Sequence, residues 1–177
     1  MRKFYRADAY ASKEKQVTTS VIPIIKEDIG NAKYVSRGIL FTYLNHLTGN
    51  PLVPENPDIY YGARPEQLDR HVHNELSGDI VPSTQDDLPI LPNFFLAAKG
   101  PDSSAAVAKR QACYDNALGA RGINSLLSYE QKNHTRGNAY CFTSTYHNRT
   151  LKIYTSHRAQ LTSPESLPKY HIHQLKR

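Results

Sequence analysis

The chain has 177 residues, which suits one domain with a real core and is too short for two comfortable ones. Its formal net charge is +6, which favours acidic partners such as nucleic acid but is weak support alone. Its two cysteines, Cys113 and Cys141, lie in unlike surroundings and exclude a disulfide framework. With neither a secretory signal nor a membrane-length apolar run recognisable, we expect an intracellular protein of the cytoplasm or nucleus with no membrane partner.

The first part of the chain predicts two helices among extended segments punctuated by prolines. Residues 1–16 are polar and are expected to be loosely held, and Pro23 makes the apolar segment around it short and extended or turn-flanked. Apolar residues spaced four apart predict a helix over residues 33–47. The aromatic pair at residues 60–61 predicts a short strand, and a helical pattern follows over residues 65–78.

The second part predicts a long strand, a helix and three further strands. The strand covers residues 92–99 and the helix residues 105–120. Alternating residues predict a hairpin over residues 139–158 that turns at Asn148-Arg149, and residues 168–175 predict an edge strand. This order of elements predicts a mixed α/β (α+β) domain with one central sheet flanked by helices.

The stretch PNFFLAAKG, residues 92–100, ends a buried apolar strand in a lysine, Lys99. A buried lysine normally needs a partner, and an acid two positions earlier would share its face, because side chains alternate along a strand. That position holds Ala97. Twelve residues before Lys99 lies Asp87, with Asp86 beside it as a rival, and either carboxylate could meet the lysine if the two ends of this segment fold toward each other.

Three segments resemble a family of uncharacterised fungal proteins with a PD-(D/E)XK nuclease-like domain of the restriction-endonuclease-like superfamily. The likeness covers roughly residues 57–157 and rests on YYGARPEQLD, on PSTQDDLPILPNFFLAAKGPDSSAAVAKRQACYDNALGARG, and on AYCFTSTYH followed by TLKIYTSH. It implies a nuclease-like core over residues 57–177, with residues 1–56 packed on it in a single globular domain. In that family the strand ends in Glu-Ala-Lys-Gly, whereas this chain has Ala97-Ala98-Lys99-Gly100 and lacks the carboxylate on which the motif most depends.

The resemblance implies hydrolysis of phosphodiester bonds with Mg²⁺ or Mn²⁺ as cofactor. Asp87 and an acid at position 97 would bind the metal, since hard cations prefer oxygen ligands. Lys99 would orient the attacking water. Glu66, at the start of a predicted helix, would be the further acid that many such nucleases supply from an early helix.

The helix predicted after the strand would complete the site. Gln111 and Tyr114 resemble the Gln and Tyr of RecB-like members, although their spacing is three where those members usually have four. Lys109, Arg110 and Arg121, together with Tyr114, would contact nucleic acid, with DNA favoured over RNA. Many nucleases of this kind work as dimers, so the resemblance also allows a homodimer.

Other interpretations stay open at this point. With Ala97 the chain should cleave poorly, either as a natural inactive module that binds nucleic acid or a protein, or because position 97 was altered; the intact remainder of the motif favours the alteration. A nuclease toxin or effector is a weaker third option. Taken singly, Lys99 could reach solvent and Asp87 could be a turn residue. The pairs His71/His73 and His171/His173 lack further ligands at zinc spacing.

Overall fold

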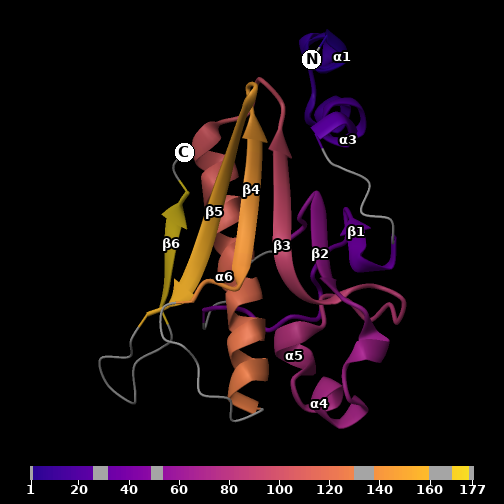
Figure 1. Ribbon diagram of the computed structural model, residues 1–177, viewed down its shortest axis with the longest axis vertical. Helices are drawn as coiled ribbons and strands as arrows, with labels where there is room; N and C mark the ends of the chain where they lie inside the picture. The colour runs from indigo at the N-terminus through magenta and orange to yellow at the C-terminus, as the bar shows by residue number, and fades with distance from the viewer. Residues whose placement is uncertain (1, 26–31, 49–53, 130–137, 160–168, 176–177) are drawn as a thin grey trace.

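The computed structural model describes residues 2–25, 32–48, 54–129, 138–159 and 169–175. A six-stranded mixed sheet with the order β1-β2-β3-β4-β5-β6 forms its centre (Figure 1). Only β3 and β4 are parallel; every other neighbouring pair among these strands is antiparallel. The sheet and its flanking helices confirm the predicted mixed α/β class. The strands are β1 Val35–Arg37, β2 Ile59–Ala63, β3 Ile90–Lys99, β4 Cys141–His147, β5 Thr150–Arg158 and β6 Tyr170–Gln174.

One long helix, α6 (Ala105–Tyr129), connects β3 to β4 and packs on one face of the sheet (Figure 1). Parallel neighbours need such a crossover, because no tight turn can join them. The helix continues past Gly119, near where the sequence predicted its end. At Gly119 a Cβ atom would lie only 2.6 Å from Cys141 Sγ and 2.8 Å from the Phe95 ring, so glycine there permits close contact between helix and sheet.

Short helices at the N-terminus pack on the other face, beside the carboxyl end of β3 (Figure 1). They are α1 Arg2–Tyr10, α2 Glu14–Gln16, the π-helix η1 Val17–Val21 and α3 Ile22–Ile25. The predictions of loosely held residues 1–16 and of an extended segment around Pro23 are therefore wrong. The physical reason is tertiary packing, since Val17, Val21 and Ile22 are buried against Leu96 and neighbouring side chains of the sheet.

The helix predicted over residues 33–47 is also wrong. The 3₁₀ turn η2 (Ala32–Tyr34) leads into β1, which pairs with β2, and Gly38 then adopts a positive φ of 58° that ends the strand. Beyond it the described residues run irregularly to residue 48, with Phe41 buried. Of the four residues with helical spacing, Val35, Ile39 and Leu47 pack against the core without a helix, whereas Tyr43 is exposed.

The second predicted helix is divided into η3 (Pro65–Gln67), α4 (Arg70–Glu75) and α5 (Ser77–Ile80). Asp69 begins α4, where its carboxylate accepts a hydrogen bond of 2.8 Å from the backbone N–H of His71. These pieces lie beside the amino end of β3 (Figure 1).

The predicted hairpin is confirmed as β4 and β5, with Asn148 and Arg149 at positive φ values of 46° and 62° in its turn. The edge strand is confirmed as β6, which pairs with β5. Across the described ranges no helix combines the length and the apolar character needed to cross a membrane.

Candidate functional site at the carboxyl end of β3

The strand β3 separates the acidic residues that the sequence was expected to bring to Lys99. Asp86 and Asp87 are exposed in a turn before the strand begins, whereas Lys99 is its last residue. Ten extended residues span about 30 Å at about 3.3 Å per residue. The hypothesis that Asp87 or Asp86 meets Lys99 is therefore wrong, because β3 lies between them and is extended apart from an irregularity at Leu91, whose φ is 52°.

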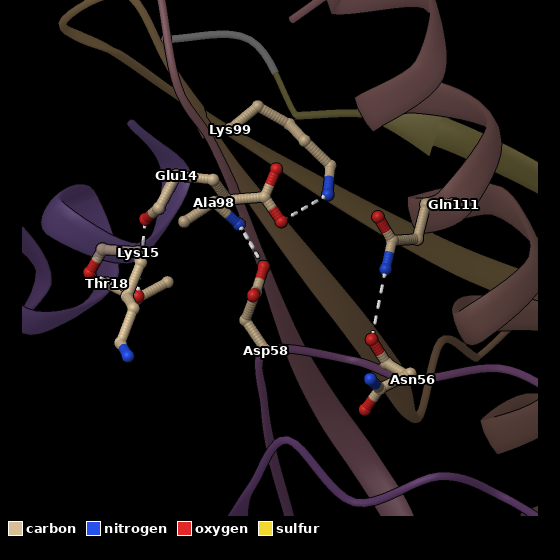
Figure 2. A network of polar contacts seen from close by, with 8 residues as sticks. All are labelled: Glu14, Lys15, Thr18, Asn56, Asp58, Ala98, Lys99 and Gln111. Atoms are coloured by element: carbon tan, nitrogen blue, oxygen red, sulfur yellow. Dashed lines mark hydrogen bonds and ion pairs between the residues drawn. The ribbon is translucent and has the colours of Figure 1, made fainter. Parts of the chain in front are cut away.

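Asp58 occupies the position that was expected of Asp87. In the antiparallel register of β2 and β3, Ile59 pairs with Leu96, so the preceding residue, Asp58, lies opposite Ala97. The Asp58 carboxylate accepts a hydrogen bond of 2.7 Å from the backbone N–H of Ala98 (Figure 2). The sequence signal for it was slight: one acid at the end of a proline-rich loop, directly before a short apolar strand.

Ala97 and Lys99 lie on the face of β3 that α6 covers. Phe95 packs against Gly119 of this helix, and side chains alternate along a strand, so residues 97 and 99 share the face of Phe95. Asp58, directly before β2, interacts electrostatically with Lys99 and with Asp115 of α6, so it lies close to both. The Ala97 side chain is completely buried, so its methyl group closes this part of the site.

The partner of Lys99 comes from the N-terminal segment. Lys99 Nζ donates a hydrogen bond of 2.9 Å to Glu14 Oε1 and forms an ion pair with it (Figure 2). The lysine side chain is 11% exposed and the glutamate side chain 41%, so the pair lies at the edge of the buried region. Gly100 permits this approach, because a Cβ atom there would lie 2.8 Å from the backbone nitrogen of Glu14.

Further carboxyl groups surround this pair. Asp115 of α6 is completely buried, and among the described residues neither of its carboxylate oxygens has a hydrogen-bond partner. Burial raises its pKa well above the ordinary value; the nearby Glu55 and Asp58 raise it further, and Lys99 opposes them. Burial likewise raises the pKa of Glu55 and of Asp58, with Lys99 opposing the shift. We call Glu14, Glu55, Asp58, Lys99 and Asp115 the carboxyl-end cluster.

Gln111 is the one residue predicted on the following helix that lies at this cluster. Its side-chain amide donates a hydrogen bond of 3.3 Å to the backbone carbonyl of Asn56, two residues before Asp58 (Figure 2). It also interacts with the Glu55 carboxyl group, whose pKa it lowers against the effect of burial. Tyr114 instead packs against the buried apolar side chains between α6 and the sheet.

Glu66 lies with the exposed acids at the other end of β3. It forms an ion pair of 3.5 Å with Arg64, is 57% exposed, and lines a cavity of about 840 Å³ together with Asp86. It is therefore not the early-helix acid of the cluster. Glu14 lies there instead, and the polar N-terminal sequence gave no signal that its helix would pack on the sheet.

The three basic residues expected to contact phosphate have different environments. Arg121 forms an ion pair of 3.2 Å with Asp79 and donates a hydrogen bond of 3.1 Å to the carbonyl of His46, so its guanidinium group is engaged within the fold. Lys109 and Arg110 are exposed on α6. Both border a shallow groove at Leu47, and Lys109 also lines a polar cavity beside β4.

The described residues contain no group of three or more His, Cys, Asp or Glu side chains arranged to hold a metal ion. Comparison with known proteins adds no relative: no protein-family model matches the chain, and neither a curated protein nor a solved structure is significantly similar to it. The contacts and charges of the carboxyl-end cluster are therefore the basis for inferring the chemistry of the site.

Proposed function

We propose that the carboxyl-end cluster is the active-site frame of a metal-dependent nuclease of the PD-(D/E)XK type, and that Ala97 leaves this chain without cleavage activity. One observation carries the proposal: Asp58 lies opposite position 97, and Lys99 follows two residues later on the same face of β3. An acid, a second acid and a lysine two positions after it are the residues that such a nuclease requires. DNA is the expected substrate.

The flanking residues support this assignment. Glu14 supplies an acid from an early helix and holds Lys99 at the strand end. Gln111 approaches from the following helix, next to the backbone that positions Asp58. In the proposed site Lys99 would orient the attacking water, and the enclosure of Ala97 and Asp115 would exclude bulk solvent.

The residues present do not fit a metal ion. A methyl group stands where a ligand is required, and the described residues include no convergent group of three ligands. With an acid at position 97, that acid and Asp58 would offer the oxygen ligands that Mg²⁺ or Mn²⁺ prefers. The metal would lower the pKa of a bound water and stabilise charge on the phosphate.

The deciding experiment replaces Ala97 with Glu. We expect Ala97→Glu to cleave single- or double-stranded DNA in Mg²⁺ or Mn²⁺ and to lose this activity in EDTA, with the unaltered chain as the inactive reference. Ala97→Gln is the matched control, because it has the same size without the charge. It should stay inactive.

Because residue 97 is completely buried, a glutamate could disturb the fold. The shorter Ala97→Asp is therefore made in parallel, and circular dichroism establishes which variants fold. Binding of Mn²⁺ by calorimetry gives a second readout that needs no substrate. A folded acidic variant that binds no metal and cleaves neither DNA nor RNA would refute the proposed function.

A second function, an inactive module that binds nucleic acid, is favoured by a separate observation. Lys99 is already paired with Glu14 and Ala97 is completely buried, so the lysine has its partner within the fold and position 97 offers no metal ligand. Binding of a DNA duplex by the unaltered chain, with an affinity that falls steeply with salt, would support this function. Absence of such binding, together with cleavage by Ala97→Glu, would exclude it.

A further inference from the structure

A polar cavity of about 360 Å³ lies beside the carboxyl-end cluster, between the first turn of α6 and the β4–β5 hairpin. Its basic side chains are Lys109 of α6, His147 of β4 and Lys152 of β5. Among the described residues that line it, none is an aspartate or a glutamate. The cavity therefore has positive charge and no carboxylate to offset it, in contrast with the acidic cluster next to it.

The sheet register fixes how close the two sites are. In the parallel pairing of β3 and β4, Thr145 is the partner of Ala97 and His147 is the partner of Lys99. Neighbouring strands lie about 4.8 Å apart, so the cavity begins one strand away from the proposed active-site strand. A nucleic-acid strand bound at the carboxyl end of β3 would therefore bring one of its phosphates near the cavity.

The polar groups of the cavity suit a tetrahedral oxyanion. His147 Nε2 is enclosed and has no hydrogen-bond partner among the described residues. Lys109 and Lys152 are exposed cations that line the same cavity. The first residues of α6, Ala105 and Ala106, also line the cavity, and the amino end of a long helix favours negative charge.

We infer that this cavity binds a phosphate group through Lys109, His147 and Lys152. The phosphate belongs either to a nucleic-acid strand beside the proposed cleavage site or to free phosphate. The inference rests on the proposed function only where the phosphate belongs to a nucleic-acid strand. Binding of phosphate itself requires neither a metal nor cleavage. It is therefore tested on the unaltered chain in EDTA.

The first measurement follows the ring resonances of His147 by NMR during titration with inorganic phosphate. Phosphate in the cavity should shift them in a saturable manner, whereas chloride at equal ionic strength should not. Lys109→Gln/Lys152→Gln should abolish the shift. The exposed pair Arg2→Gln/Lys3→Gln, on α1, removes the same charge and should leave it unchanged.

The second measurement is the affinity for a short labelled DNA duplex across a salt series. If the phosphate belongs to a strand, the double lysine variant should bind more weakly and its salt slope should fall by about 2, one for each lost contact. The α1 control should change less in both. A saturable phosphate shift with equal slopes in the two variants would assign the cavity to free phosphate.

One combined outcome would overturn the inference. If phosphate leaves the His147 resonances in place and the lysine variant binds DNA like the α1 control, the cavity is not a phosphate site. Failure of Ala97→Glu to cleave would leave both measurements intact, so the inference and the proposed function fail separately.

Discussion

The two ends of β3 carry acidic residues in opposite environments. At the amino end, Asp86, Asp87 and Glu66 are exposed, and Glu66 forms a surface ion pair. At the carboxyl end, Asp115 is completely buried and Asp58 is half-buried near Lys99, and burial raises the pKa of both. Enclosed carboxyl groups with shifted pKa values are typical of functional sites, whereas exposed acids are stabilised by water. This contrast between the two ends supports the proposal of a functional site at the carboxyl end.

The largest expected effect contrasts Asp58 with Asp87 in a cleavage-competent background. In Ala97→Glu, the further change Asp58→Asn should lower cleavage by about 100-fold or more, because loss of a direct metal ligand should cost at least as much as loss of its supporting residues. Asp87→Asn should leave the rate within about twofold, since that residue is exposed at the far end of β3. Cleavage of a labelled DNA duplex under single-turnover conditions measures both.

The two double variants control for each other, since each removes one carboxylate from the same parent. Equal loss in both would show that the rate depends on overall charge and not on the position of Asp58. If only the Asp87 variant lost most of its cleavage rate, the active site would lie at the amino end of β3, contrary to the proposal.

The sequence predicts those features of the two ends of β3 that depend on residues close together in the chain. The strand ending at Lys99, the helix beginning at Ala105 and the hairpin turning at Asn148 each follow from patterns within one segment. Asp58 and Glu14 do not, because the antiparallel pairing of β2 and the packing of α2 bring them to β3 from far along the chain. Glu14 and Lys99 are separated by 85 residues.

The same reasoning explains the errors near the N-terminus. Residues 33–47 have helical spacing, but pairing with β2 determines the conformation of β1 and Gly38 ends it. Residues 1–16 are polar on average, yet Ala11 is buried against the sheet. Average polarity says little about a segment that packs through a few side chains. The sequence therefore predicted the early-helix acid at Glu66, whereas Glu14 is the acid from an early helix that lies at the cluster.

A smaller effect, on stability, is expected at Asp115, whose carboxyl group has no hydrogen-bond partner among the described residues. Its folded-state pKa is raised by burial above its unfolded value of about 3.9, so the folded protein retains a proton that the unfolded chain releases. Stability should therefore fall as pH rises above about 4, until the folded carboxyl group ionises. Asp115→Asn removes this pH-dependent loss, so its stability relative to the parent should increase from pH 4 to pH 8.

At pH 4 the two proteins should differ little through this group, because the carboxyl group is then largely protonated in the folded state. Urea unfolding at pH 4, 6 and 8 measures the difference, with the exposed Asp102→Asn as control. A stability difference that stays constant from pH 4 to pH 8 would contradict the raised pKa of Asp115.

The smallest expected effect compares the ion pairs at the two ends of β3. Glu14→Gln should lower the free energy of unfolding by about 1 kcal/mol, because Lys99, at 11% exposure, has little water to replace the lost charge. The loss stays this small because Glu14 is 41% exposed and its charge is partly screened by water. Glu66→Gln should cost no more than about 0.5 kcal/mol, since water surrounds its pair with Arg64.

Urea unfolding of both variants at low salt and at about 1 M NaCl separates the two pairs, because salt screens exposed charges more strongly than enclosed ones. The Glu66 difference should disappear at high salt, and part of the Glu14 difference should remain. If the two losses of unfolding free energy were equal and both disappeared at high salt, the Glu14–Lys99 pair would contribute no more to stability than the exposed Glu66–Arg64 pair. The N-terminal segment would then contribute packing, but no electrostatic support, to the lysine of the proposed site.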